Sequence, residues 1–150
     1  MKYAAITLTA LSAIALIGCA GADTPTDTVS YDYNIQTATG SSLGTLELTN
    51  MGDKGTKVTI KLKGLEQGLR AMHFHEFGKC EAPGFTSAGG HYNPTGAAHG
   101  TKMEDGPHAG DMMNIMIGAD GTGEAEFIND RVSITSNGPL PPLMDADGSA

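Results

Sequence analysis

The sequence is poor in basic residues, the residue type that an anionic polymer would contact. Its 150 residues include nine lysines and arginines against 17 aspartates and glutamates, which gives a formal net charge of −8 at pH 7. Proteins that bind nucleic acids generally concentrate positive charge on the surface that meets the phosphates. The shortage of basic residues therefore argues against a nucleic-acid partner.

The sequence also lacks an apolar run long enough for a typical membrane span. The run from Ala4 to Ile17 follows a positive start at Lys2 and has the length of a signal-peptide core. It leads into Leu-Ile-Gly-Cys at residues 16–19, which resembles a bacterial lipobox, where the cysteine is lipidated and becomes the mature N-terminus. We expect residues 1–18 to be a lipoprotein signal peptide, with an ordinary cleavage site near Cys19 as the alternative.

The segment after the cysteine has no hydrophobic periodicity. Residues 20–28 combine glycine, aspartate and proline with three threonines, a composition typical of a flexible polar linker. More than one acyl chain on Cys19 would give stable membrane anchoring. We therefore expect residues 19–28 to be a lipidated tether that holds one domain, residues 29–150, in the cell envelope on the periplasmic side of a membrane.

That domain lacks a convincing amphipathic helix and any internal repeat. Apolar and polar residues instead alternate over short segments separated by turn residues such as those at 50–55, which predicts strands with one buried face. The six predicted strands are residues 29–35, 45–49, 57–63, 70–76, 114–118 and 124–128. Short strands with frequent turns indicate an all-β sandwich or barrel.

Histidine is absent from the whole chain except for residues 73–111. That stretch contains all five histidines of the protein, and an aspartate follows the last of them by three residues. The set is His73, His75, His91, His99, His108 and Asp111. A lone histidine is more often an ordinary surface or core residue than a ligand. The density of this group nevertheless predicts a metal site.

The first two histidines belong to the predicted strand at residues 70–76. Side chains alternate between the two faces of a strand, so His73 and His75 share one face, while Met72 and Phe74 point towards the core. Two imidazoles side by side on a rigid strand can hold one metal ion.

The remaining candidates follow a loop that is too rich in glycine and proline for a regular element, residues 82–96. A long loop in a compact domain usually has a function or an internal tie. Three imidazoles and a carboxylate form a closed set of four ligands suited to tetrahedral zinc. These are His91, His99, His108 and Asp111. Imidazole also suits copper.

Four motifs carry a family resemblance. They are His73-Phe74-His75-Glu76, Ser-Ala-Gly-Gly-His-Tyr-Asn-Pro at residues 87–94, His99-Gly100 and His108-Ala109-Gly110-Asp111. They resemble the motifs of copper,zinc superoxide dismutases, above all the exported bacterial branch, and the resemblance extends from Val29 to Ala150. It implies an all-β, immunoglobulin-like Greek-key β-barrel or sandwich of eight strands, of which the six predicted strands are present.

The resemblance also implies a function and two metals. Copper would be bound by the catalytic residues His73, His75 and His91, and zinc by His91, His99, His108 and Asp111, with His91 bridging both ions. The enzyme would disproportionate superoxide to oxygen and hydrogen peroxide as an antioxidant, with redox chemistry at copper and structural support from zinc. A homodimer is compatible with the resemblance.

The resemblance breaks off near residues 140–150. The family's fourth copper histidine, an active-site arginine and a second disulfide cysteine belong to a later segment, and Cys80 matches the first cysteine of that disulfide. We expect the sequence to be a fragment and, in this form, a poor dismutase; the alternative is a genuinely short protein. The alternative function is a non-catalytic exported module of the same fold that binds zinc or copper.

Overall fold

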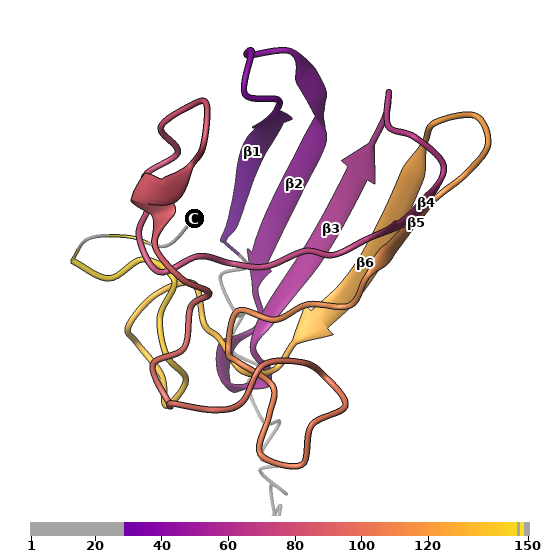
Figure 1. The fold of residues 1–150 in the computed structure, drawn as a ribbon. Coiled ribbons are helices and arrows are strands. Elements are labelled where there is room, and N and C mark those ends of the chain that lie inside the picture. Colours follow the sequence, from indigo (N-terminus) through magenta and orange to yellow (C-terminus); the bar gives the residue numbers. More distant parts are fainter. Residues whose placement is uncertain (1–28, 147, 149–150) are drawn as a thin grey trace, which may run out of the picture.

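The computed structural model describes residues 29–146 and 148, which form an all-β fold of six strands, as expected (Figure 1). The strands are β1 (Ser30–Gln36), β2 (Ser42–Asn50), β3 (Thr56–Leu62), β4 (Gly68–Arg70), β5 (Ile115–Ile117) and β6 (Gly123–Asn129). Two short 3-10 turns, η1 (Gly52–Lys54) and η2 (Thr86–Ala88), interrupt the loops. The predicted signal peptide and Cys19 lie outside the described residues.

The strands form two antiparallel sheets. Four strands pair in the order β1-β2-β3-β6, and β4 pairs with β5. In the larger sheet, Leu48 lies opposite Val58 and Leu46 opposite Ile60, so the apolar residues of β2 and β3 share one face. Lys57, Thr59 and Lys61 of β3 alternate onto the other face, as predicted from the pattern. The described strands do not close into a barrel.

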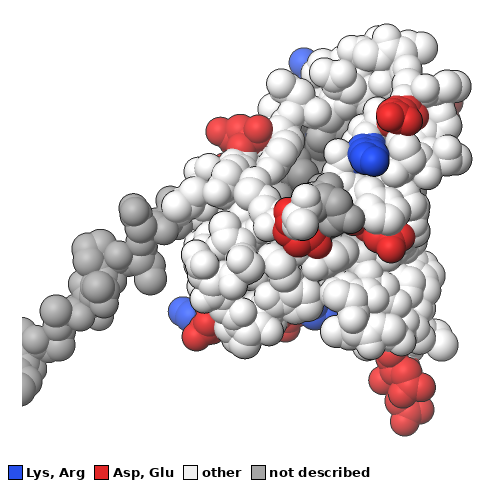
Figure 2. Space-filling view, turned by 90° about the vertical axis from the view of Figure 1, so that its left-hand side faces the viewer, with Lys and Arg blue, Asp and Glu red and all other residues white. Residues whose placement is uncertain are grey.

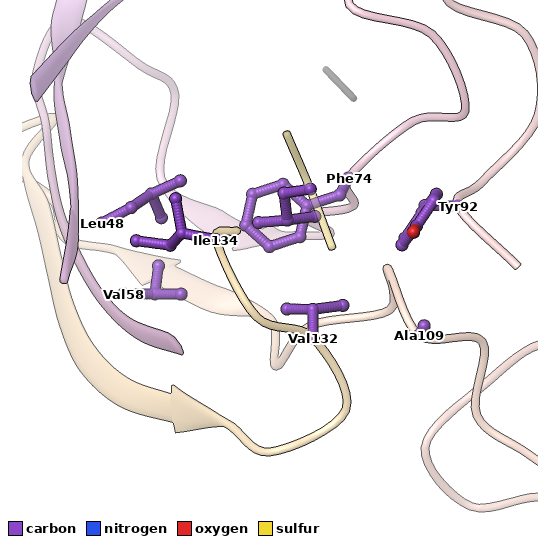
Figure 3. Packing of buried hydrophobic residues seen from close by; sticks show 8 residues of the cluster. Leu48, Val58, Phe74, Tyr92, Ala109, Val132 and Ile134 are labelled. Carbon is purple, nitrogen blue, oxygen red and sulfur yellow. The ribbon is translucent and has the colours of Figure 1, made fainter. Parts of the chain in front are cut away.

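A buried cluster joins this sheet to the loops. Its members are Leu48, Val58, Phe74, Tyr92, Ala109, Val132, Ile134 and Leu143. Figure 3 shows Leu48 and Val58 on the sheet side of the cluster, with Tyr92 and Ala109 on the loop side. A second cluster packs Ile60 and Leu62 of β3 against β5. Burial of these side chains is the main favourable contribution to folding.

The prediction of a strand at residues 70–76 is wrong in its position. β4 ends at Arg70, and the following segment crosses the face of the larger sheet, where His73 and His75 form only isolated bridges to Asp111 and His91 (Figure 1). The partners of this segment are single loop residues, so a continuous ladder cannot form. The alternation itself holds, because Phe74 is buried in the first cluster and Met72 packs against the second.

The expectation of one buried face also fails at β1. Tyr33, which pairs with Leu46 on the inner face, is 42% exposed. A cleft of about 660 Å³ separates this part of the sheet from the loop that carries Cys80 and Phe85. Cys80 is an exposed free thiol. The second cysteine that the resemblance implied therefore has no counterpart in the described part of the chain.

Charged side chains are scattered over the face shown in Figure 2, where acidic and basic groups are interspersed on a mostly uncharged surface. This face carries no continuous basic surface, in line with the composition. In the described residues, no helix has the length and apolar character needed to cross a membrane.

Candidate metal centre

A ring of three backbone hydrogen bonds joins three segments that are far apart in the sequence. The N–H of Phe74 donates to the carbonyl of Gly110 at 2.9 Å. The N–H of Gly110 donates to the carbonyl of Tyr92 at 2.8 Å, and the N–H of Tyr92 donates to the carbonyl of Phe74 at 2.9 Å. Each of these residues is next to a candidate ligand in the sequence. The ring therefore brings the ligand-bearing segments together at the level of the main chain.

Packing of the same segments directs the candidate ligands. Phe74, Tyr92 and Ala109 are all buried in the core cluster. In extended backbone, neighbouring side chains point in opposite directions, so a residue that points into the core turns the adjacent imidazole away from it. The core thus fixes where His73, His75 and His91 can point.

Asp111 is the centre of the resulting group. It is 1% exposed, and its Oδ2 accepts the N–H of Gly100 at 2.8 Å and that of His108 at 3.1 Å. Its Oδ1 faces ring nitrogens of four histidines: His99 at 3.1 Å, His91 at 3.3 Å, His108 at 3.5 Å and His73 at 3.9 Å. One carboxylate oxygen is therefore held in place by the backbone, which leaves the other for the histidines.

His91 lies between two groups of imidazoles. Its ring stacks on that of His73 with centroids 3.8 Å apart, and meets His75 edge-on at 5.3 Å. The ring centroid of His91 also lies 5.0 Å from that of His99 and 5.7 Å from that of His108. Among the five histidines, His91 alone has a ring contact with all the others in the described structure. This central position is the geometry that a shared ligand would need.

His75 is set apart from the carboxylate. Its Nδ1 lies 3.2 Å from the carbonyl oxygen of Gly89, which fixes the ring plane through a backbone contact. A backbone carbonyl in contact with the ring nitrogen that faces away from the metal commonly orients a metal-binding histidine and selects its tautomer. His75 therefore approaches the group through His91 and not through Asp111.

The electrostatics favour the protonation states that bind metals. Burial lowers the pKa of His73 below its ordinary value of 6.5, and repulsion from His91 adds to this effect. Burial also lowers the pKa of His91, and the interaction with Asp111 opposes this shift without reversing it. Burial raises the pKa of Asp111, but the N–H groups of Gly100 and His108 and nearby imidazoles lower it further, to a net value below the ordinary one. Neutral imidazoles and an ionised carboxylate are the forms that ligate metals.

The donor set fits a metal ion. Ligand atoms of His73, His91, His99 and Asp111 all lie within 4.8 Å of one another. His108 Nδ1 lies nearer to Oδ1 of Asp111 than the ring nitrogen of His73 does, so it can join the same donor set. This nitrogen is buried without a hydrogen-bond partner. A buried polar atom without a partner costs free energy, which coordination would recover. Imidazole nitrogens with one carboxylate oxygen suit zinc, and imidazoles alone suit copper.

Comparison with known proteins decides the family. Residues 42–149 match the sequence profile of copper/zinc superoxide dismutase (SODC). The chain is also 38% identical over 117 residues to superoxide dismutase [Cu-Zn] of Caulobacter vibrioides, which covers 77% of this chain and 67% of the relative. The chain belongs to the copper/zinc superoxide dismutase family.

Proteins named superoxide dismutase-like are similar to this chain as well. The superoxide dismutase-like protein YojM of Bacillus subtilis is 32% identical over 127 residues, covering 83% of this chain and 64% of the relative. The crystal structure of a SOD-like protein from Bacillus subtilis superposes with a TM-score of 0.72 at 32% identity, covering 79% of this chain and 78% of that one. The chain thus spans about two thirds of the length of both relatives.

A more distant structure shares the fold. Cu/Zn superoxide dismutase from Brucella abortus superposes with a TM-score of 0.53 at 24% identity, covering 69% of this chain and 73% of that chain. The Greek-key architecture that the resemblance implied is therefore the architecture of the structural neighbours, with the described sheets left open.

In this dismutase-family chain, sequence reasoning missed two contributors to the site. Asp111 is oriented by the backbone N–H of Gly100, and a backbone group leaves no signal in residue type. Lys102, which belongs to none of the four motifs, lines a cleft of about 420 Å³ together with His73, His99 and Asp111. Its position three residues after His99 is the only sequence signal that could have pointed to it.

Proposed function

We propose that the protein is a superoxide dismutase that converts two superoxide anions and two protons into oxygen and hydrogen peroxide. The observation that carries the proposal is the position of His91, which touches both the His73–His75 pair and the imidazoles around Asp111. A single imidazole has two nitrogens and can serve one ion on each side. Membership of the family supports the same assignment.

In this proposal His73, His75 and His91 hold copper, and His91, His99, His108 and Asp111 hold zinc. Copper, when bound, supplies the one-electron redox chemistry, whereas zinc has no accessible redox change. The chain supplies position: Asp111 is fixed by two backbone N–H groups, and His75 by a backbone carbonyl. The cleft beside His73 and His99 gives a small anion access to the centre, with Lys102 as a positive charge on its wall.

A non-catalytic metal-binding module is the second candidate. It is favoured by the similarity to a Bacillus subtilis protein named superoxide dismutase-like. Such a module would bind the same metals without turning over superoxide.

The decisive experiment loads the purified full chain with copper and zinc and measures superoxide removal. We expect activity that depends on copper and falls at least about tenfold in His75→Ala, because this variant lacks a proposed copper ligand. Zinc binding should be spared, since His75 contacts the group only through His91. A chain that binds both metals stoichiometrically and leaves the rate of superoxide decay unchanged would exclude the dismutase and support the module.

We also propose export and lipid anchoring through Cys19, motivated by the apolar run that ends in Leu-Ile-Gly-Cys. Expression in a bacterium that processes lipoproteins, followed by detergent phase partitioning, tests it. Wild type should enter the detergent phase and Cys19→Ala should not. If both remain in the aqueous phase and the wild type carries an unmodified N-terminus, the anchor does not exist.

A further inference from the structure

The end of β6 contacts the turn that carries two of the candidate ligands, residues 108–111. Asn129, the last residue of β6, donates from Nδ2 to the carbonyl of Ala109 at 3.0 Å. Arg131 donates from Nη2 to the carbonyl of Asp111 at 2.7 Å. Two side chains from one short segment thus hold two carbonyls of the ligand turn, one on either side of Gly110.

Asn129 is fully engaged in this arrangement. It is 1% exposed, and its Oδ1 accepts the N–H of Arg131 at 3.1 Å while its Nδ2 reaches Ala109. The bond from Arg131 fixes the plane of the Asn129 amide, and this plane sets the direction in which Nδ2 donates to Ala109. A buried amide whose oxygen and nitrogen are both paired has a single favourable orientation.

The segment that supplies the two donors is itself immobilised. Asn129 pairs with Thr56 of β3, and Thr56 Oγ1 donates to the carbonyl of Val132 at 3.1 Å. Thr56 and Val132 are both completely buried. A side chain on the neighbouring Gly55 would collide with the backbone of Asn129, which shows how closely the two strands approach. The donors therefore extend from a rigid part of the sheet.

The arginine is held from its other side as well. Its Nη1 lies 3.2 Å from Oδ1 of Asp130, a carboxylate that is largely exposed. Its Nε is buried without a hydrogen-bond partner. An arginine extended into water would avoid that cost. The charge-assisted contact with the carbonyl of Asp111 is the interaction in this position that offsets it.

We propose that Asn129 and Arg131 are positioning residues of the metal centre. Neither is a ligand, because the guanidinium of Arg131 and the amide nitrogen of Asn129 have no lone pair to offer a cation, and the amide oxygen of Asn129 accepts the N–H of Arg131. They act through the backbone: by fixing the carbonyls of Ala109 and Asp111, they set the directions of His108 and Asp111 towards the ion. The proposal rests on the metal centre of the proposed function and adds the element of the sheet that tunes it.

Zinc affinity and the visible spectrum of a Co²⁺-substituted protein test the proposal. Arg131→Gln removes a donor from a partly exposed position, so the fold should survive. We expect zinc affinity, measured by competition with a chelator, to fall by about 10- to 100-fold, as is typical when an outer-shell partner is lost. The Co²⁺ absorption bands should shift, because they report ligand direction and not overall stability.

Arg70→Gln is the matched control. It makes the same change of charge and size, and Arg70 donates to the backbone carbonyl of Leu69 within β4 and to that of Glu66 just before β4. Zinc affinity and the Co²⁺ spectrum should remain those of wild type. Arg131→Lys keeps a positive donor and should restore part of the affinity that Arg131→Gln loses.

Asn129→Asp is the second test, because it replaces the donor to Ala109 with an oxygen at nearly constant shape. Asn129→Asp should weaken zinc binding by the folded protein. The unfolding of this variant is measured separately without metal, so that a loss of stability is not counted as a loss of affinity. Arg131→Gln with wild-type zinc affinity and an unchanged Co²⁺ spectrum would overturn the proposal, even if its melting temperature fell. A wild-type chain that binds no zinc would refute the centre and this proposal together, whereas zinc binding without dismutation would refute the enzyme alone.

Discussion

Gly110 lies so close to Phe74 that a Cβ on the glycine would be 2.5 Å from the carbonyl oxygen of Phe74. Real Cβ atoms essentially never come this near to another heavy atom, so the two main chains meet only because residue 110 has no side chain. The contact lies in the hydrogen-bonded ring that joins the ligand-bearing segments. The metal centre therefore depends on a close packing of backbones and not only on its ligands.

Gly110→Ala should disrupt the centre without removing any ligand. The methyl group must push Phe74 away from residue 110 or break the hydrogen bond between them, which costs about 1–3 kcal/mol of folding free energy as overpacking. Zinc affinity should fall with it. Gly90→Ala is the control, since a Cβ there meets nothing within 4 Å although Gly90 is next to His91. Equal urea midpoints and zinc affinities for the two variants would contradict this account.

Much of the fold could be predicted from the sequence because alternation reports which face a residue occupies. Strands at β2, β3 and β6 were found within a few residues, and Phe74 faces the core as predicted. The strand through His73 was misplaced because alternation does not report hydrogen-bond partners. Those partners, His91 and Asp111, come from distant loops, and pairing over such separations leaves no local pattern.

The candidate site was predictable to the extent that it consists of side chains of one chemical type. The histidines and Asp111 stand out in the sequence, and the structure brings His73, His91, His99 and His108 around one oxygen of that carboxylate. What holds them could not be predicted. The N–H of Gly100, the close approach of Gly110 and the donors of β6 are properties of tertiary contacts.

Zinc should stabilise the domain, and His108 should be required for this effect. A metal that binds only the folded state adds about 4 kcal/mol of stability at a free concentration about 1,000 times its Kd. His108→Ala removes a ligand candidate whose buried Nδ1 has no hydrogen-bond partner. It should weaken zinc by more than the roughly 10- to 100-fold typical of outer-shell changes. Melting curves with and without zinc measure this effect, and His75→Ala should retain the zinc-dependent rise. Identical curves for wild type in both conditions would rule out a structural site.

The stability of the metal-free protein should fall as the pH falls from about 8 to about 5. The pKa values of His73 and His91 are lower in the folded state than their ordinary 6.5. As the pH passes through 6.5, the unfolded chain takes up protons that the folded chain does not, so protonation favours unfolding. Asp111, whose pKa is also lowered from 3.8, extends the loss to more acidic conditions. Urea midpoints should decline over this range, and the decline should be smaller in a His73→Gln, His91→Gln variant. A flat profile for wild type would show that these shifts do not contribute.

Lys102 should attract superoxide to the centre. The chain has a formal net charge of −8, so its overall field repels an anion, and attraction must come from charges near the cleft. Lys102 lines the cleft that also exposes His73 and His99, and Lys102→Glu reverses that charge without touching a ligand. With copper and zinc bound, kcat/KM should fall about 2- to 10-fold at low ionic strength, and the difference should shrink as salt screens the charge. Lys61→Glu makes the same change on the outer face of β3 and should have a smaller effect, because Lys61 lines only a separate depression of the sheet. If both variants lower the rate equally at every salt concentration, the net charge and not Lys102 governs the encounter.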